Sequence, residues 1–356
     1  MYETKLRVAL AKPVLTGHLA RGTGTYAREL EKALKQQGIT VVSAFANQLP
    51  EDVDLYHFPY FDPFFLTLPW FRRKKTILTI HDLIPLRFQN EFPVGLRGSV
   101  SWFIQKLLAQ HVSAIITDSE SSRSDIQNFI HLGKSKIAVV YLAAASDFYT
   151  PVSKAILQKI RKKYLLPEKF GLFVGDVNWN KNLPRVISAM KQSALPLVIV
   201  SQSYSTTPKA SYHPWEQSLH EAQQVAQGYQ NLTVLNSVST SELRVLYKLA
   251  SFLLYPSLYE GFGLPVVEAF ASGCPVITSD CGSLKEISGN AAVIVNPESV
   301  DDMVAAIKRL SSAQVRQQLI AQGFKRARIF SWEKTARETI AVYQNTLNTD
   351  FNSKMK

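Results

Sequence analysis

The chain has 356 residues, of which 46% are apolar, 11% aromatic and 19% charged. This balance is ordinary for a globular protein and excludes a chain that is disordered throughout. At about 150 residues per domain, the length predicts two domains. The two cysteines are too few for a disulfide scaffold, and no stretch approaches the ~18 uninterrupted apolar residues of a membrane span. We therefore expect a soluble, cytoplasmic protein without a signal peptide.

The chain is strongly basic, with 40 Lys and Arg against 28 Asp and Glu, which gives a formal net charge of +12. Such a charge favours an anionic partner, which could be a nucleic acid, an anionic membrane or a phosphorylated small molecule. Acidic residues interrupt the cations throughout and no known basic motif is present. We therefore expect no nucleic-acid partner.

The first half of the chain alternates strand patterns with helix patterns. A helix is expected over 26–35, where apolar residues recur at helical spacing, and Gly38 ends it. The sequence predicts strands at 6–10, 40–45, 55–57, 76–80, 114–117 and 137–141. Strands rich in Val and Ile that alternate with helices indicate a parallel sheet with both faces covered.

The pattern restarts after a basic helix expected between Pro151 and Pro167. Further strands are predicted at 171–174, 196–201, 233–235, 252–255, 276–278 and 292–295, with helices at 184–193, 241–250, from 265, 300–310 and 332–347. The fold class is therefore α/β, with two doubly wound Rossmann-like domains that face each other across a cleft and bind ligand at the carboxyl ends of their strands. We expect domains at 1–165 and 166–335, and a C-terminal helix within 336–356 that packs back on the first domain.

The most specific pattern is the run Pro-Ser-Leu-Tyr-Glu-Gly-Phe-Gly-Leu-Pro-Val-Val-Glu-Ala over 256–269. It follows an apolar strand and opens a helix, with Pro265 suited to the first helical turn. Gly261 and Gly263 let the backbone approach a ligand closely, and the free N–H groups of a helix start favour a phosphate. Glu260 and Glu268 bracket this turn, and carboxylates are natural acceptors for the hydroxyls of a ribose or a hexose.

This double-glutamate block resembles the retaining GT-B glycosyltransferases of family 4, also called group 1, and the resemblance covers most of the chain. Similar blocks occur in the expected order: Phe-Val-Gly at 173–175, Asn-Lys-Asn-Leu at 180–183, Ala-Ser-Gly-Cys-Pro-Val-Ile at 271–277 and Phe-Ser-Trp at 330–332. In the first half, Gly-Thr-Gly-Thr-Tyr at 22–26 and Thr-Ile-His-Asp-Leu-Ile-Pro-Leu at 79–86 also match, as in mannosyltransferase-like members.

The resemblance implies a site and a reaction. The implied donor-binding residues are Gly22, Gly175, Lys181, Glu260, Gly261, Phe262, Gly263, Leu264 and Glu268, and the implied catalytic residues are His81, Lys181 and Glu260. The implied reaction is transfer of a hexose from a nucleotide-sugar to a hydroxyl of a glycan or lipid-linked acceptor. It retains the anomeric configuration and uses no cofactor and no metal. The 79–86 block makes GDP-mannose the donor we expect first, with a UDP-sugar as the other choice.

Each implied role attaches to a single residue. Glu260 holds hydroxyls of the transferred sugar, Glu268 holds the ribose, and Lys181 neutralises the departing diphosphate, as a buried cation does for a developing anion. Gly22, in the loop after the first strand, lets the first domain close on the diphosphate, and His81 lies beside the reacting sugar. The backbone of 262–264 faces the sugar and its phosphate.

One position departs from the family pattern. Asn180 stands where an arginine usually precedes the lysine, so diphosphate stabilisation could be weaker here unless another cation such as Arg185 substitutes. A catalytically weak sugar-nucleotide-binding module is therefore the first alternative. An NAD-dependent oxidoreductase is the second, because 22–27 also fits G-x-G-x-x-A, although about a dozen residues separate it from the first strand.

Two further segments bear on metals and membranes. Asp52-Val53-Asp54 could bind a divalent ion through a donor diphosphate, but its place directly before a strand favours turn chemistry. The cysteines, Cys274 and Cys281, lack the close partners of a zinc site, so we expect no metal. The segment 60–75 joins bulky aromatics to Arg72-Arg73-Lys74-Lys75, which suits peripheral contact with the inner face of the cell membrane or with a lipid-linked acceptor.

Overall fold

The computed structural model describes residues 6–12, 22–205 and 214–353. The chain divides into two compact units: unit 1 comprises Met1–Leu142 with Ser331–Lys356, and unit 2 comprises Ala143–Phe330. These divisions lie about twenty residues before the boundary placed at 165 and a few residues before the one placed at 335. Within the described ranges, no helix is long and apolar enough to cross a membrane.

Unit 1 is built on a six-stranded parallel sheet in the order β2-β1-β3-β4-β5-β6. Its strands are β1 (Arg7–Lys12), β2 (Thr40–Phe45), β3 (Leu55–Phe58), β4 (Lys75–Thr79), β5 (Ala114–Thr117) and β6 (Ile137–Val139). The chain runs outward from β1 to β2 and then returns to continue through β3 on the other side. Such a reversal creates the switch point at which doubly wound sheets bind ligands, here between β1 and β3.

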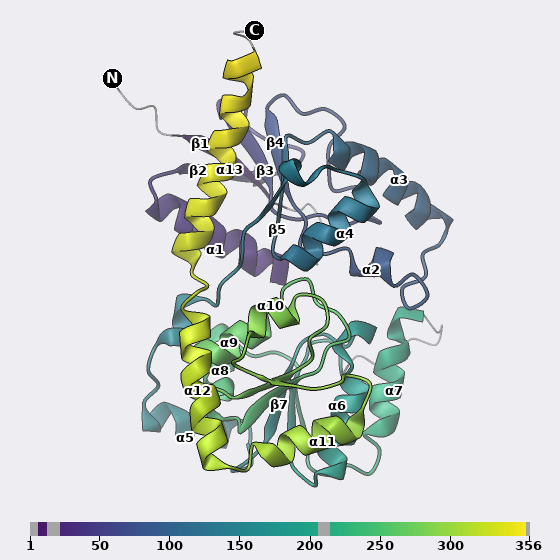
Figure 1. The fold of residues 1–356 in the computed structure, drawn as a ribbon, viewed down its shortest axis with the longest axis vertical. Helices are drawn as coiled ribbons and strands as arrows, with labels where there is room; N and C mark the ends of the chain where they lie inside the picture. The colour runs from purple at the N-terminus through teal and green to yellow at the C-terminus, as the bar shows by residue number, and fades with distance from the viewer. Residues whose placement is uncertain (1–5, 13–21, 206–213, 354–356) are drawn as a thin grey trace. The chain divides into compact units, whose positions relative to one another are not determined.

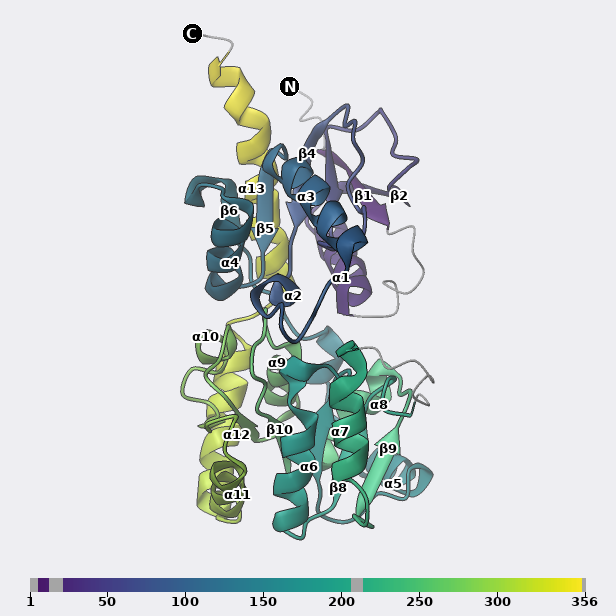
Figure 2. The same cartoon turned by 90° about the vertical axis from the view of Figure 1, so that its right-hand side faces the viewer.

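Both faces of this sheet carry helices (Figures 1 and 2). These are α1 (Gly22–Gln36), α2 (Ile84–Arg87), α3 (Leu96–Gln110), α4 (Glu120–Ile130) and α13 (Trp332–Ser353). Alternate residues of a strand point to opposite faces. Tyr56 and Phe58 therefore share a core with residues of α3 and α4, whereas His57 faces α13 and contacts Tyr343. Helix α13 lies against α1 and against β4 and β5, so the end of the chain belongs to unit 1.

Unit 2 repeats the architecture in the order β12-β11-β10-β7-β8-β9. Its strands are β7 (Gly171–Val174), β8 (Leu197–Val200), β9 (Leu232–Leu235), β10 (Phe252–Tyr255), β11 (Val276–Thr278) and β12 (Val293–Ile294). Its helices are α5 (Lys154–Lys163), α6 (Leu183–Gln192), α7 (Gln217–Val225), α8 (Thr240–Leu249), α9 (Leu264–Ser272), α10 (Leu284–Ser288), α11 (Val300–Arg309) and α12 (Ala313–Ala327). The switch point of this sheet lies between β7 and β10, and the loops that follow these two strands hold the candidate site.

Most predicted elements are present with bounds shifted by a residue or two. The sequence analysis did not predict α7 or α12. Helix α12 has four large apolar residues in fifteen, and Gly323 lies inside it, where a Cβ would stand 2.9 Å from the Phe270 ring. That close packing on α9, rather than helix propensity, explains both the glycine and the weak sequence signal.

Candidate functional site

The loop after β7 brings Lys181 to the switch point of unit 2. It runs through Gly175 and a short 3-10 turn at Trp179–Lys181, and Asn182, in the left-handed region at φ 58°, starts α6. A Cβ on Gly175 would stand 3.8 Å from the Lys181 Cδ, so the glycine lies alongside the aliphatic part of that side chain. The turn therefore aims the ammonium group toward the loop that follows β10.

Lys181 forms a buried ion pair with Glu260, which the loop after β10 supplies. Its Nζ donates to Glu260 Oε1 at 2.8 Å, to Glu260 Oε2 at 2.9 Å and to the Tyr255 hydroxyl at 2.6 Å. Burial alone would lower the pKa of Lys181, but the Glu260 carboxylate raises it above its ordinary value. The ammonium group is therefore charged at any physiological pH, as a residue that neutralises an anion must be.

Asparagine side chains fix the loop that carries Glu260. The Asn180 side chain donates to the Tyr259 carbonyl at 3.0 Å, and its own carbonyl accepts from the Leu258 N–H at 2.8 Å. The Asn182 side chain donates to the Pro256 carbonyl at 3.0 Å. The Asn180 side chain is buried and its amide is used in the hydrogen bond to Tyr259. At the position where the family has an arginine, Asn180 therefore positions the loop that carries Glu260. Arg185, the expected substitute cation, donates to Asn182 Oδ1 at 3.0 Å.

Gly282, which the sequence analysis did not single out, supports Glu260 from the other side. It follows β11 with φ +60°, and a Cβ there would lie 2.6 Å from the Glu260 carbonyl oxygen and 2.9 Å from its nitrogen. The next residue, Ser283, donates its N–H to the same carbonyl at 3.1 Å. The signal that could have found Gly282 is its place at the carboxyl end of a strand adjacent to β10.

The predicted glycine turn forms the start of α9. Gly263 lies in the left-handed region at φ 93°, and Pro265 occupies the first turn. A Cβ on Gly263 would stand 2.7 Å from Leu284 Cδ2, so a larger residue would have to displace that side chain as well as adopt a strained φ. Phe262 is buried and packs edge-on against Phe330, with ring centroids 5.8 Å apart. This turn leaves the amide groups of the first turn of α9, beginning at Leu264, beside the Gly261 loop, as an anion site requires.

Glu268 lies in the second turn of α9 and faces α8. Its Oε2 accepts a hydrogen bond from the buried Tyr247 hydroxyl at 3.0 Å. Burial raises the pKa of Glu268 to about 7, although the Tyr247 hydrogen bond acts in the opposite direction. Glu268 is therefore half ionised near neutral pH, and hydroxyl groups that donate to it would favour the carboxylate form.

His81 lies in unit 1, directly after β4. Its Nδ1 is 2.6 Å from Asp118 Oδ2 and its Nε2 is 3.2 Å from the Pro59 carbonyl. Both partners only accept, so both nitrogens carry hydrogen. Burial alone would lower the pKa of His81, but Asp118 raises it above its ordinary value. The ring also meets Tyr26 of α1 edge-on at 4.8 Å, so His81 is an oriented imidazolium at the carboxyl edge of the sheet.

Asp118 is a second site residue that the sequence analysis missed. It is buried at the end of β5, and its Oδ1 has no hydrogen-bond partner among the residues that the structure describes. The signal was the polar run Thr-Asp-Ser at 117–119 directly after an apolar strand. Because β5 neighbours β4, its carboxyl end meets that of β4 at the same edge.

One prediction about a loop needs correction. Gly22 was expected in the loop after the first strand, but it is the first residue of α1. The helix includes Gly24 because Tyr26, Leu30 and Leu34 bury its apolar face, and tertiary packing overrides the low helix propensity of glycine. The G-x-G-x-x-A stretch is thus helical and is not the strand-to-helix turn of a dinucleotide site.

Asp52 and Asp54 tie the start of β3 to the start of β1. Asp54 accepts the Arg7 N–H at 2.7 Å, and Asp52 pairs with the Arg7 guanidinium at 2.8 Å. Within 6–12, 22–205 and 214–353, no group of three or more His, Cys, Asp or Glu side chains is placed to hold a metal ion.

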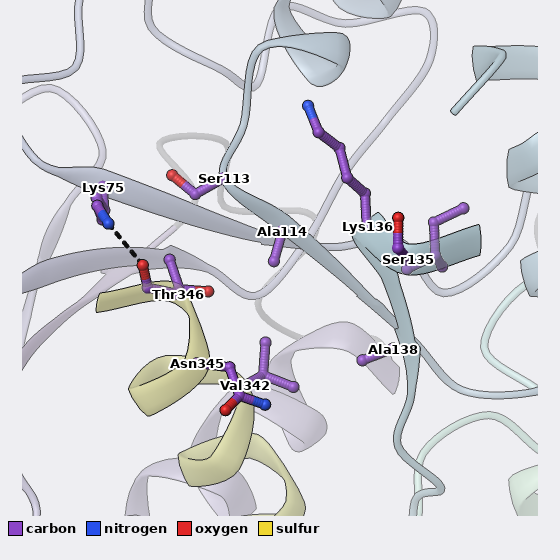
Figure 3. Close-up of a pocket in the computed structure, with 10 residues that line it drawn as sticks. Lys75, Ser113, Ala114, Ser135, Lys136, Ala138, Val342, Asn345 and Thr346 are labelled. Atoms are coloured by element: carbon purple, nitrogen blue, oxygen red, sulfur yellow. Dashed lines mark hydrogen bonds between the residues drawn. The ribbon is translucent and has the colours of Figure 1, made fainter. Parts of the chain in front are cut away.

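A pocket of about 370 Å³ lies elsewhere in unit 1 (Figure 3). It is lined by Lys75, Ser113, Ala114, Ser135, Lys136, Ile137, Ala138, Val342, Asn345 and Thr346. These residues come from the amino ends of β4, β5 and β6 and from α13, whereas His81 follows the carboxyl end of β4. The Lys75 ammonium group donates to the Thr346 carbonyl at 2.6 Å, so this lysine fastens α13 to the sheet.

Comparisons with known proteins agree with this arrangement. The family model described as glycosyl transferases group 1 matches residues 157–326, and the model of glycosyltransferase family 4 matches residues 42–148. An Escherichia coli O-antigen chain mannosyltransferase B is 30% identical over 302 residues, which are 82% of this chain and 74% of that enzyme. A serotype-specific mannosyltransferase of the same species is 28% identical over 79% of this chain, but the match spans only 34% of that longer enzyme.

The fold is likewise that of solved glycosyltransferases. A sucrose-phosphate synthase from Thermosynechococcus elongatus superposes with a TM-score of 0.75 over 97% of this chain and 100% of the other, at 18% identity. Two parallel six-stranded sheets with this strand order are the GT-B architecture. The chain therefore belongs to the group 1, family 4 glycosyltransferases of the GT-B fold, and it is a hexosyltransferase.

Proposed function

We propose that this enzyme is a retaining mannosyltransferase that takes mannose from GDP-mannose and needs no metal ion. The relatives at 28–30% identity are named as mannosyltransferases. The observation that carries the proposal is the buried Lys181–Glu260 pair at the switch point of unit 2, because it joins a permanent cation to a hydroxyl acceptor.

The residues of unit 2 divide the donor between them. The diphosphate lies at the first turn of α9, and the Lys181 ammonium group neutralises the charge that develops as it departs. The Glu260 carboxylate gives up part of its pairing with Lys181 to accept hydroxyls of the mannose. Glu268, one turn further into α9, accepts the ribose hydroxyls. Because Lys181 is charged at every working pH, it supplies the electrophilic assistance that a divalent ion supplies elsewhere.

The acceptor is a hydroxyl of a glycan or of a lipid-linked glycan, and the enzyme works at the cytoplasmic face of a membrane. Two relatives act in O-antigen chain synthesis, according to their names. In unit 1, the His81 imidazolium hydrogen-bonded to Asp118 supplies positive charge at the carboxyl edge of the sheet. A weak sugar-nucleotide-binding module is the competing function, since Asn180 stands where the family has an arginine and its side chain donates to the Tyr259 carbonyl.

Thermal denaturation with GDP, UDP or ADP, each with and without Mg²⁺, tests the donor. A ligand at about a hundred times its Kd stabilises the folded state by roughly 2.7 kcal/mol. We expect a metal-independent shift with GDP alone, and transfer from GDP-mannose with retention when the product anomer is assigned by NMR. Lys181→Ala should bind GDP and lose most of its turnover. A shift with UDP alone would overturn the donor assignment, and GDP binding without turnover would identify a binding module.

A further inference from the structure

We propose that α3 and the segment 62–74 of unit 1 form one surface that docks on an anionic membrane. The inference rests on the proposed function only for the suggestion that the acceptor is lipid-linked. Eight of the fourteen large apolar side chains that are exposed among the described residues belong to these two segments. They are Phe65, Leu66, Trp70, Phe71, Leu96, Val100, Phe103 and Leu107. Phe71 is 93% exposed and Leu96 83%. Single exposed apolar residues are common on protein surfaces, but a cluster of them indicates an interaction site.

The exposed side chains of α3 form a single stripe. Leu96, Val100, Phe103 and Leu107 recur at intervals of four, three and four residues, so they share one face of the helix. Gln105 is buried on the opposite face, toward the sheet. The helix is therefore apolar on two sides, and the core of unit 1 uses only one of them.

Gln105 joins the 62–74 segment to α3. Its side-chain amide donates to the Asp62 carbonyl at 2.9 Å, to the Phe65 carbonyl at 2.7 Å and to the Thr67 hydroxyl, and its oxygen accepts the Leu68 N–H. The Arg72 guanidinium donates to the Leu108 carbonyl at 3.2 Å. These bonds attach the segment to α3 through the face opposite the stripe, so the segment and the helix cover the same face of the sheet.

The charge of this surface selects the partner. Neither 63–80 nor 92–117 contains an Asp or a Glu, whereas both contain cations. At 3.6 residues per turn, Arg97 and Lys106 fall about 90° to either side of the apolar stripe, where long basic side chains reach the headgroups while apolar ones enter the bilayer. A second protein could cover an apolar stripe, but cations along both flanks match an anionic lipid surface.

The surface also begins near the edge of the unit 1 sheet that carries His81. Helix α3 follows the carboxyl end of β4 and runs back toward the amino end of β5, so Leu96 and Val100 lie toward the edge of the sheet that carries His81. A lipid-linked acceptor held in the membrane would therefore present its glycan at this edge of unit 1.

Vesicle co-sedimentation tests the proposal in the absence of donor and acceptor. The full chain is mixed with vesicles of phosphatidylcholine alone or with phosphatidylglycerol added. The stripe variant carries Leu96→Gln, Val100→Gln and Phe103→Gln. The charge variant carries Lys74→Glu, Arg97→Glu and Lys106→Glu. It spares Arg72 and Lys75, because these two bond to backbone carbonyls. The matched control carries Ile156→Gln, Leu165→Gln and Ile329→Gln, which remove exposed apolar side chains of unit 2.

We expect wild type and control to sediment with phosphatidylglycerol vesicles. The stripe variant should lose at least about tenfold in partitioning, since three exposed apolar side chains that would enter the bilayer become polar. The charge variant should lose about fivefold per replaced cation, and its binding should become independent of the anionic lipid. Unchanged melting and GDP affinity in both variants would show that the fold and donor site are intact, which separates this test from that of the proposed function.

Three results would overturn the proposal. Wild type could remain in the supernatant with both vesicles, or the stripe variant could bind as wild type does. Alternatively, analytical ultracentrifugation could show a dimeric wild type and a monomeric stripe variant without vesicle binding. The surface would then be an interface between two copies of the chain.

Discussion

The raised pKa of Glu268 predicts that donor affinity depends on pH. The ionised carboxylate accepts two ribose hydroxyls far more strongly than the protonated acid does, and burial places the pKa of this group at about 7 in the free enzyme. From about pH 8.5 to about pH 5.5 the ionised fraction falls from ~97% to ~3%, so the apparent Kd rises about thirtyfold. Binding should therefore strengthen as pH rises, and it should release a proton near neutral pH.

Isothermal titration calorimetry with GDP-mannose measures this dependence without acceptor. GDP is less suitable for this measurement, because its own terminal phosphate titrates near pH 6 and would add a second pH dependence. Glu268→Gln keeps an oxygen that accepts a hydrogen bond but cannot ionise, so its affinity should be lower at pH 8 and nearly independent of pH. Tyr247→Phe removes a hydrogen bond that lowers the pKa of Glu268, so its midpoint should move upward. A wild-type affinity that is flat with pH, or a slope that persists in Glu268→Gln, would refute the reasoning.

Two further predictions concern the loop under Glu260 and the stability of unit 1. Gly282→Ala combines φ +60° with a Cβ 2.6 Å from the Glu260 carbonyl oxygen, so it should cost about 1–3 kcal/mol and lower kcat at least about tenfold. Gly228→Ala, at φ +72° with open space among the described residues, should show the backbone strain in its melting curve but normal turnover; equal kinetics in both variants would contradict the positioning role. Burial lowers the pKa of His57 to about 3, so the unfolded chain takes up a proton below pH 6.5 and the folded chain does not. Stability should therefore fall by about 2 kcal/mol between about pH 7 and about pH 5. Urea unfolding of His57→Asn should lack that loss, and an identical slope would exclude His57 as its source.

Much of the fold followed from local sequence patterns. Both faces of each sheet are covered, so its strands are short, continuous runs of apolar residues bounded by turns. Such runs alone predicted the strands at 171–174 and 252–255 correctly. The glycine turn before α9 was predictable for a similar reason. A left-handed residue followed by a proline in the first turn restricts the backbone locally, and Gly263 and Pro265 carry that restriction in their own chemistry.

Tertiary structure decided which side chains meet. Lys181 and Glu260 are 79 residues apart, and only the pairing of β7 with β10 brings their loops together. The same holds for His81 and Asp118, which follow neighbouring strands. It also holds for Gly282, because a Cβ at this position would lie 2.6 Å from the Glu260 carbonyl oxygen. The partner of Asn180, the Tyr259 carbonyl, also became evident only from the fold, because the turn places the two groups side by side.

The sequence by itself determined the fold class, the strands and the glutamate-glycine turn, because these depend on periodicity and backbone geometry within a few residues. Only the tertiary structure placed Gly22 inside a helix, set the pKa of Glu268 near 7 and exposed the stripe on α3. Burial and charge contacts belong to pairs of residues far apart in the chain. A helix that is apolar on two sides looks from its sequence like any buried helix until its neighbours are known.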